Sequence, residues 1–152
     1  MLLIAALGML AYRSLSSTTS ALRISRWTDE PVPNRRLTPG VTRPVSTSEV
    51  CTVRYSDDTN LVAASVREKV YREYGMADPQ AKDYQLDYLI SPQLGGTDDI
   101  RNLWPEPASL PGWNMRAKDH LEDRLHQLVC QGELNLSTAQ SDLATDWVSA
   151  YK

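Results

Sequence analysis

The 152-residue chain contains no phenylalanine, only two histidines and only two cysteines. The cysteines are far apart and form no Cys-x-x-Cys pair, so a zinc knuckle or a thioredoxin-type motif has little support. The net charge is -3, and a mildly acidic chain is a poor generic binder of polyanions, which requires clustered Lys and Arg. These residues suffice for one packed domain of ordinary size with a tail and leave no room among them for a second.

The chain also lacks an apolar run that would cross a membrane by itself. Residues 2–12 are apolar, with no charge before Arg13. About 12 helical residues reach only about 18 Å, against about 30 Å of hydrocarbon. Three explanations compete: an uncleaved anchor helix that continues through residues 14–21, a signal peptide, or a start codon placed too late. We expect the anchor, a hydrophobic helix over residues 1–21. Both the anchor and the signal peptide place the remaining chain outside the cytoplasm.

Prolines interrupt residues 22–48, where four of them stand among polar residues. We expect an extended Pro-rich linker here that wraps or tethers a domain over residues 49–152. Five arginines of the linker are interpreted as a solvated connector, in preference to a contact with nucleic acid or anionic lipid: Arg23, Arg26, Arg35, Arg36 and Arg43. At the start of the domain, the alternation over residues 46–55 predicts a short strand.

Apolar periodicity predicts a helix on each side of the chain's centre. The first follows capping residues at 58–60, repeats its valines every four residues and ends before Gly75, where a left-handed cap is expected. The last opens with a capping box at Ser137 and continues through Trp147.

A third helix is predicted from a cap at Asn114 to about Cys130. Its apolar stripe is formed by Ala117, Leu121, Leu125, Leu128 and Val129. Its charged residues are Lys118, Glu122, Asp123 and Arg124, and we expect these to face water, with spacings that permit Lys-to-Glu pairing.

The central stretch, residues 84–107, reads YQLDYLISPQLGGTDDIRNLWPEP. Residues 84–90 alternate with the period of a strand, and Ser91-Pro92 ends it. Gly95-Gly96 permits backbone angles closed to other residues, and residues 102–105 return to an apolar environment. A polar loop between a strand and a later helix is able to gather side chains around a metal and a phosphate.

This stretch resembles the core of the HNH (His-Me finger) nuclease family, in the bacterial branch whose signature is roughly D-H-L-I, L-G-G, N-L-W-P. The resemblance continues through Lys118-Asp119, Leu121-Glu122, Leu125-His126, Val129-Cys130, Gly132 and residues 144–148, and upstream through residues 37–40 and Cys51. It implies an α+β fold, a mainly helical small domain around a ββα hairpin.

Residue by residue, the resemblance assigns Asp87 as the metal carboxylate and Asn102 as the loop asparagine. Asn114 is our candidate for the second metal ligand, and the ion would be Mg²⁺ or Zn²⁺. Tyr88 stands where the family has its histidine, the proton acceptor. A phenol with a pKa of about 10 is protonated at neutral pH and does not replace an imidazole. Loss of a general base costs about 10²- to 10⁴-fold in rate.

The remaining candidates have simpler roles. His126 is interpreted as structural or as a helix-end residue, and His120 as an exposed helix residue. For Asp87 the alternative to a metal site is a solvent-facing strand residue paired with Arg101. Asp98 and Asp99 are interpreted as turn formers. Trp104 and Trp113 are expected to seal the core beside the loop, in preference to stacking on a base.

Cys51 and Cys130 are either two buried thiols in a reducing compartment or one bridge in an oxidising one. Because the amino-terminal segment points outside the cytoplasm, we favour the disulfide. The entropy model gives about 4 kcal/mol for closing so long a loop.

Two functions follow. The preferred one is a membrane-anchored or exported HNH-like domain that has lost efficient hydrolysis and serves as an accessory or docking subunit, on a membrane protein complex or a membrane surface. The alternative is an active metal-dependent endonuclease that cleaves nucleic acid.

Overall fold

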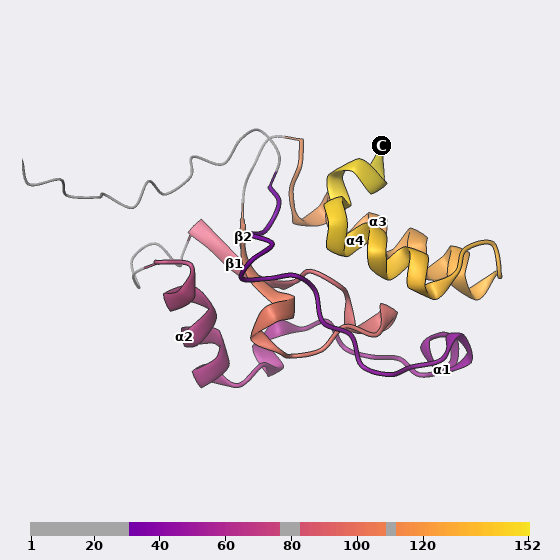
Figure 1. Ribbon diagram of the computed structural model, residues 1–152, viewed down its shortest axis with the longest axis horizontal. Coiled ribbons are helices and arrows are strands. Elements are labelled where there is room, and N and C mark those ends of the chain that lie inside the picture. Colours follow the sequence, from indigo (N-terminus) through magenta and orange to yellow (C-terminus); the bar gives the residue numbers. More distant parts are fainter. Residues whose placement is uncertain (1–30, 77–82, 109–111) are drawn as a thin grey trace, which may run out of the picture.

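The computed structural model describes residues 31–76, 83–108 and 112–152 (Figure 1). The chain is an α+β protein, about half helical with a small two-stranded antiparallel sheet, so the predicted fold class is confirmed at that level. The hydrophobic helix predicted over residues 1–21 lies outside the described residues. Within the described ranges, no helix combines the length and the apolar character needed to cross a membrane.

Four helices and two strands make up the described part of the chain, with short 3-10 turns between them. In order they are α1 (Thr47–Thr52), a 3-10 turn (Thr59–Leu61), α2 (Ala64–Glu73), β1 (Tyr84–Tyr88), two further 3-10 turns (Pro92–Leu94 and Ile100–Asn102), β2 (Leu103–Pro107), α3 (Met115–Cys130) and α4 (Leu136–Tyr151).

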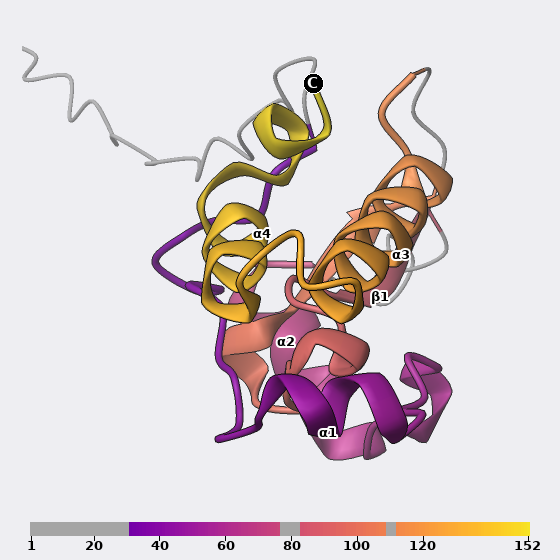
Figure 2. The ribbon, with the colours of Figure 1, turned by 90° about the vertical axis from the view of Figure 1, so that its right-hand side faces the viewer.

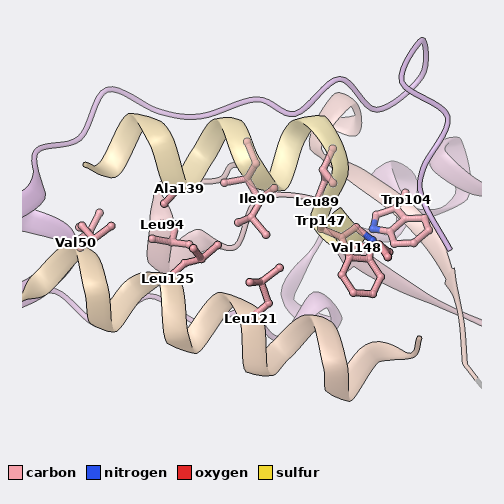
Figure 3. Packing of buried hydrophobic residues seen from close by; sticks show 12 residues of the cluster. Val50, Leu89, Ile90, Leu94, Trp104, Leu121, Leu125, Ala139, Trp147 and Val148 are labelled. Atoms are coloured by element: carbon pink, nitrogen blue, oxygen red, sulfur yellow. The ribbon is translucent and has the colours of Figure 1, made fainter. Parts of the chain in front are cut away.

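The larger hydrophobic core lies where α3 and α4 pack side by side (Figure 2). Leu121 and Leu125 of α3 point toward Ala139 and Trp147 of α4, and Trp104 of β2 closes one end (Figure 3). The predicted stripe of α3 is therefore its buried face at Leu121, Leu125 and Val129. Trp104 is fully buried, and Trp113 packs edge-on against Trp147, so both tryptophans seal the core as predicted.

The two strands form a hairpin whose faces look toward different helices. Tyr88 pairs with Leu103 and Asp87 with Trp104. Because side chains alternate along a strand, Tyr88 and Leu103 point to one face, where they pack with residues of α2. Asp87 and Trp104 point to the other face, which is covered by α3. The hairpin thus separates the smaller core from the larger one.

The strand predicted over residues 46–55 is wrong, because Thr47–Thr52 form the short helix α1 and residues 53–55 belong to no strand. The Ser46 side chain accepts a hydrogen bond from Glu49 N, which caps the first turn. A disulfide then joins Cys51 to Cys130 at the end of α3, with an S–S distance of 2.04 Å and a Cα–Cα distance of 5.5 Å. The predicted bridge is therefore confirmed, and it holds α1 against α3.

The other helix boundaries differ from prediction by small shifts. The caps at residues 58–60 open a separate 3-10 turn, and α2 begins only at Ala64. Gly75 ends α2 in the expected left-handed conformation, with φ 69°. Asn135 precedes α4, so the predicted capping box at Ser137 lies inside the helix. At Asp146 the backbone leaves helical geometry, and its carboxylate accepts a hydrogen bond from Ser149 N.

The described part of the proline-rich segment, from residue 31 to the start of α1, crosses the domain and contacts it repeatedly. Trp147 Nε1 donates to Pro31 O at 2.8 Å, and the buried Thr38 hydroxyl donates to Leu103 O at 2.9 Å. Arg43 donates to Gly96 O and Pro92 O, and its guanidinium stacks over the Tyr55 ring. The boundaries proposed at residues 22 and 49 stay predictions.

Candidate functional site

The sequence-predicted Asp87 lies in a buried ionic cluster between the hairpin and α3. Lys118 Nζ is 2.8 Å from Asp87 Oδ2 and donates to Glu122 Oε1 at 2.6 Å and to the Tyr88 backbone carbonyl. The contacts with Glu122 and Tyr88 are hydrogen bonds, and the contact with Asp87 is an ion pair. Lys118 is only 1% exposed, so its charge is compensated entirely from within the protein.

Lys118 and Glu122 were expected to face water, and this prediction is wrong. One helical turn separates them, so both project from the same side of α3 toward β1. Burial alone would lower the pKa of Lys118, but the neighbouring acidic groups, first of them Asp87, outweigh it and raise the pKa. Lys118 is therefore a permanently charged group inside the domain.

Glu106 of β2 completes the cluster as a buried carboxyl group. It is 1% exposed, and neither carboxyl oxygen has a hydrogen-bond partner within the protein. Burial, and next the charge of Asp87, raise the pKa of Glu106 to about 9, although Lys118 opposes the shift. Burial likewise raises the pKa of Glu122. Glu106 therefore keeps its proton at neutral pH.

Tyr88, in place of the expected histidine, is held as a hydrogen-bond donor. Its side chain is buried, and its hydroxyl donates to Asp98 Oδ1 at 2.8 Å. Burial raises the pKa of Tyr88, and the bond to Asp98 and the charges of Asp98, Asp57 and Asp87 raise it further. A nearby cation would have to lower this pKa to produce a base, and the surroundings shift it in the opposite direction.

The Asn102 side chain holds the loop between the strands. Its Oδ1 accepts from Ile90 N at 3.1 Å, and its Nδ2 donates to Ile90 O and Thr97 O at 3.0 Å each. Gly96 makes this approach possible, because a Cβ there would lie 1.7 Å from Ile90 O. The adjacent Gly95 is in the left-handed region with φ 94°. Of these two positions, position 95 requires glycine for its backbone angles. Position 96 requires glycine because any Cβ there would clash with the Ile90 carbonyl.

The other sequence-predicted residues lie outside the ionic cluster. Asn114 caps α3, where its Oδ1 accepts from Ala117 N at 3.3 Å. His120 is exposed on α3, as predicted. His126 contacts Val50 O at 2.9 Å through Nε2. Arg101 pairs with Asp99 and not with Asp87, so that alternative for Asp87 is wrong.

A cavity of about 250 Å³ opens in front of the cluster, and most of its polar wall is acidic. Its acidic residues are Asp57, Asp58, Asp87, Asp119 and Glu122, and Tyr88 also lines it. Burial and the neighbouring Asp87 charge raise the pKa of Asp119, as expected among like charges. Lys118 lies behind this wall, so the cavity presents negative charge to a ligand.

The two predicted metal ligands do not fit a divalent cation as they are placed. The Asp87 carboxylate already pairs with an ammonium, and Asn114 is engaged as a helix cap. Across residues 31–76, 83–108 and 112–152, no group of three or more His, Cys, Asp or Glu side chains is arranged to hold a metal ion. The metal role of Asp87 and Asn114 stays a prediction.

Lys118, Glu122 and Glu106 were missed, although the sequence holds a signal for each. Lys118 and Glu122 fall at i and i+4, and Leu121 and Leu125 at i+3 and i+7, so both charged residues continue the buried stripe. Glu106 is two residues from Trp104, which places both on the same face of a strand. No strand bounds are assigned to residues 103–107 from the sequence, so that signal is not used.

The chain matches no protein-family model, and no curated protein or solved structure is significantly similar to it. The resemblance to HNH nucleases therefore stays a prediction from the motifs within this sequence.

Proposed function

We propose that the chain is an exported or membrane-anchored domain with an HNH-like ββα scaffold that does not hydrolyse phosphodiesters and serves as an accessory or docking subunit. The observation that carries this proposal is the Lys118 ammonium, 2.8 Å from Asp87 and 2.6 Å from Glu122. In a working site of this kind, the carboxylate of Asp87 holds a divalent cation. Here a side chain of the same domain already balances that carboxylate.

The surroundings of Tyr88 support the same conclusion. A general base must accept a proton from the attacking water near neutral pH. The Tyr88 hydroxyl donates its proton to Asp98, and burial raises its pKa. Neither histidine replaces it, because His120 is exposed on α3 and His126 contacts Val50 at the α1 end of the molecule.

The charge of the cavity supports a protein partner over nucleic acid. Protein surfaces that bind phosphate backbones carry Lys and Arg, whereas this cavity is lined by five acidic residues. Like charges repel a phosphodiester at this position. The partner that we propose is a membrane protein complex, reached through the anchor predicted over residues 1–21. The Cys51–Cys130 disulfide is compatible with an oxidising compartment.

A plasmid-nicking assay tests the loss of hydrolysis. The unmodified chain, Asp87→Ala and an exposed control, Asp83→Ala, are incubated with supercoiled plasmid and Mg²⁺, Mn²⁺ or Zn²⁺. We expect no nicking by any of them, because Asp87 is engaged with Lys118 and no base replaces the histidine. Metal-dependent nicking that is lost in Asp87→Ala and kept in Asp83→Ala would establish the alternative function, an active endonuclease, and refute the proposal.

The histidine itself is tested by Tyr88→His, with the exposed Tyr151→His as the matched control. If the scaffold is of the HNH type, nicking by Tyr88→His alone supports a lost proton acceptor. Thermal unfolding of each variant, measured in parallel, separates lack of activity from lack of folding. Membrane fractionation of the full chain tests the anchor, and its recovery as a lone soluble protein would contradict the proposed docking role.

A further inference from the structure

The disulfide between Cys51 and Cys130 has a histidine beside one of its two sulfurs. His126 lies one turn before Cys130 on α3, and its Nε2 is 3.7 Å from Cys130 Sγ. Both cysteines are exposed, so a small thiol in solution reaches the bridge. The bridge joins α1, a helix of six residues, to the end of α3.

The contacts of His126 determine which ring nitrogen carries a proton. Its Nε2 is 2.9 Å from the carbonyl oxygen of Val50. A carbonyl oxygen only accepts hydrogen bonds, so Nε2 carries the hydrogen and is the donor. Cys130 Sγ lies 3.7 Å from the same nitrogen, close enough for this N–H to turn toward the sulfur once the S–S bond is broken. A disulfide sulfur is a weak acceptor, but a thiolate is a charged one, and hydrogen bonds to charged groups are about twice as strong.

We propose that Cys51–Cys130 is an exchangeable disulfide, in which His126 makes Cys130 the leaving group and so controls how firmly α1 is held. A thiolate of a small reductant attacks Cys51 Sγ, the S–S bond breaks, and its electron pair leaves on Cys130 Sγ. A second thiolate then attacks the reductant's sulfur in the mixed disulfide with Cys51. This step releases the oxidised reductant and the Cys51 thiolate. A leaving thiolate that is stabilised departs faster, so the first attack is directed to Cys51.

The same step loosens α1. In the oxidised chain, α1 is held by the disulfide, by the buried Val50 side chain and by the bond from His126 to Val50 O. Once Cys130 is a thiolate, the Nε2–H of His126 has a stronger acceptor than Val50 O. Reduction thus breaks the covalent link between α1 and α3, and the His126 N–H then donates to the Cys130 thiolate in place of Val50 O. The bridge therefore acts as a redox-controlled latch between α1 and α3.

The rate and the site of thiol exchange test the proposal on the full chain. Reduction by dithiothreitol is followed under native conditions for the unmodified chain, His126→Leu, His126→Gln and the exposed control His120→Leu. We expect His126→Leu to be reduced about three- to ten-fold more slowly, because the donor is gone. His126→Gln keeps an N–H donor and recovers part of the rate, and His120→Leu matches the unmodified chain.

A purely structural role for His126 gives the opposite sign. Loss of the bond to Val50 O would then expose the bridge more often and make His126→Leu faster, and that result would overturn the proposal. Glutathione supplies a second readout, since mass spectrometry locates the mixed disulfide. Attachment mainly at Cys51 in the unmodified chain supports the proposal, and attachment mainly at Cys130, or equally at both, contradicts it.

Discussion

Asn102 makes more side-chain hydrogen bonds than any other site residue predicted from the sequence. Its amide exchanges hydrogen bonds with both backbone groups of Ile90, donates to Thr97 O and accepts from Val41 N at 3.4 Å. The residue is fully buried, so water does not replace these partners. One side chain thus joins the end of the first strand, the glycine loop and the extended segment around residue 41.

We expect Asn102→Ala to lower the free energy of unfolding by about 3 kcal/mol or more, because it leaves several buried backbone groups without partners. Denaturant unfolding of the full chain measures the loss. The matched control is Asn60→Ala, since Asn60 is exposed and its side chain contacts only its neighbour Asp58 among the bonds of the described residues. Equal stability of the two variants would show that Asn102 does not organise the loop.

The sequence points to this residue because three of its four hydrogen bonds fall within residues 90–102. The cap at Asn114 acts within a single turn. The roles of Lys118 and Glu106 depend instead on contacts across the fold. A lysine on an amphipathic helix is usually solvated, and only the position of β1 against α3 reveals that Lys118 is enclosed.

Between elements, the cluster around Lys118 joins α3 to the hairpin. Lys118 of α3 contacts Asp87 and the carbonyl of Tyr88 on β1, and Glu122 one turn later faces the same cluster. The larger core fixes the other edge of the buried face of α3 through Leu121 and Leu125. The orientation of α3 on the hairpin is therefore set jointly by its apolar stripe and by the charged pair Lys118 and Glu122.

We expect Lys118→Met to lower the free energy of unfolding by about 3–5 kcal/mol, because the Asp87 carboxylate loses its counter-ion and buried Glu122 loses its hydrogen-bond donor while a side chain of similar length remains. Chemical denaturation measures this change. Lys69→Met is the control, since Lys69 also has a glutamate at i+4 but is half-exposed. A triple variant, Asp87→Asn/Lys118→Met/Glu122→Gln, should recover much of the loss. If Lys118→Met is no worse than Lys69→Met, the ionic cluster does not hold α3 in place.

Apolar periodicity predicts the bounds of α3 to within a residue and those of α2 and α4 to within a turn or two. These helices are predicted because their apolar stripes are long. The strand predicted over residues 46–55 failed because α1 has only six residues, too few for a helical repeat to be recognised. It is held by tertiary contacts, the disulfide and the bond from His126 to Val50 O. The sequence pattern does not predict β2, because prolines at 105 and 107 disfavour a strand.

At the scale of the whole molecule, the cluster at the centre of the domain contains more acidic side chains than basic ones. Asp87, Glu106 and Glu122 surround one lysine, and two of these carboxyl groups have raised pKa values because of burial. The domain therefore takes up protons on folding, since the unfolded chain releases them near the ordinary value of 4.5. Its stability as a whole depends on pH through groups at its centre.

We expect the free energy of unfolding to fall as the pH rises from about 5 to about 9. Folded Glu106 keeps its proton up to about pH 9, while the unfolded residue loses its proton near 4.5. Across this window the folded state binds more protons than the unfolded state, so stability declines by up to about 1.4 kcal/mol per pH unit for this group. Denaturant titrations at several pH values measure the slope.

Glu106→Gln identifies the group responsible, because glutamine has nearly the same shape and does not titrate. The variant should lose about half of the slope, because Glu122 also has a raised pKa, and it should be more stable than the unmodified chain at the alkaline end, where ionised Glu106 would otherwise be buried without a partner. Glu133→Gln, on the exposed turn after α3, should leave the slope unchanged. If the Glu106→Gln and unmodified curves run parallel from pH 5 to pH 9, the buried carboxyl group of Glu106 is not the proton-binding site of the folded domain.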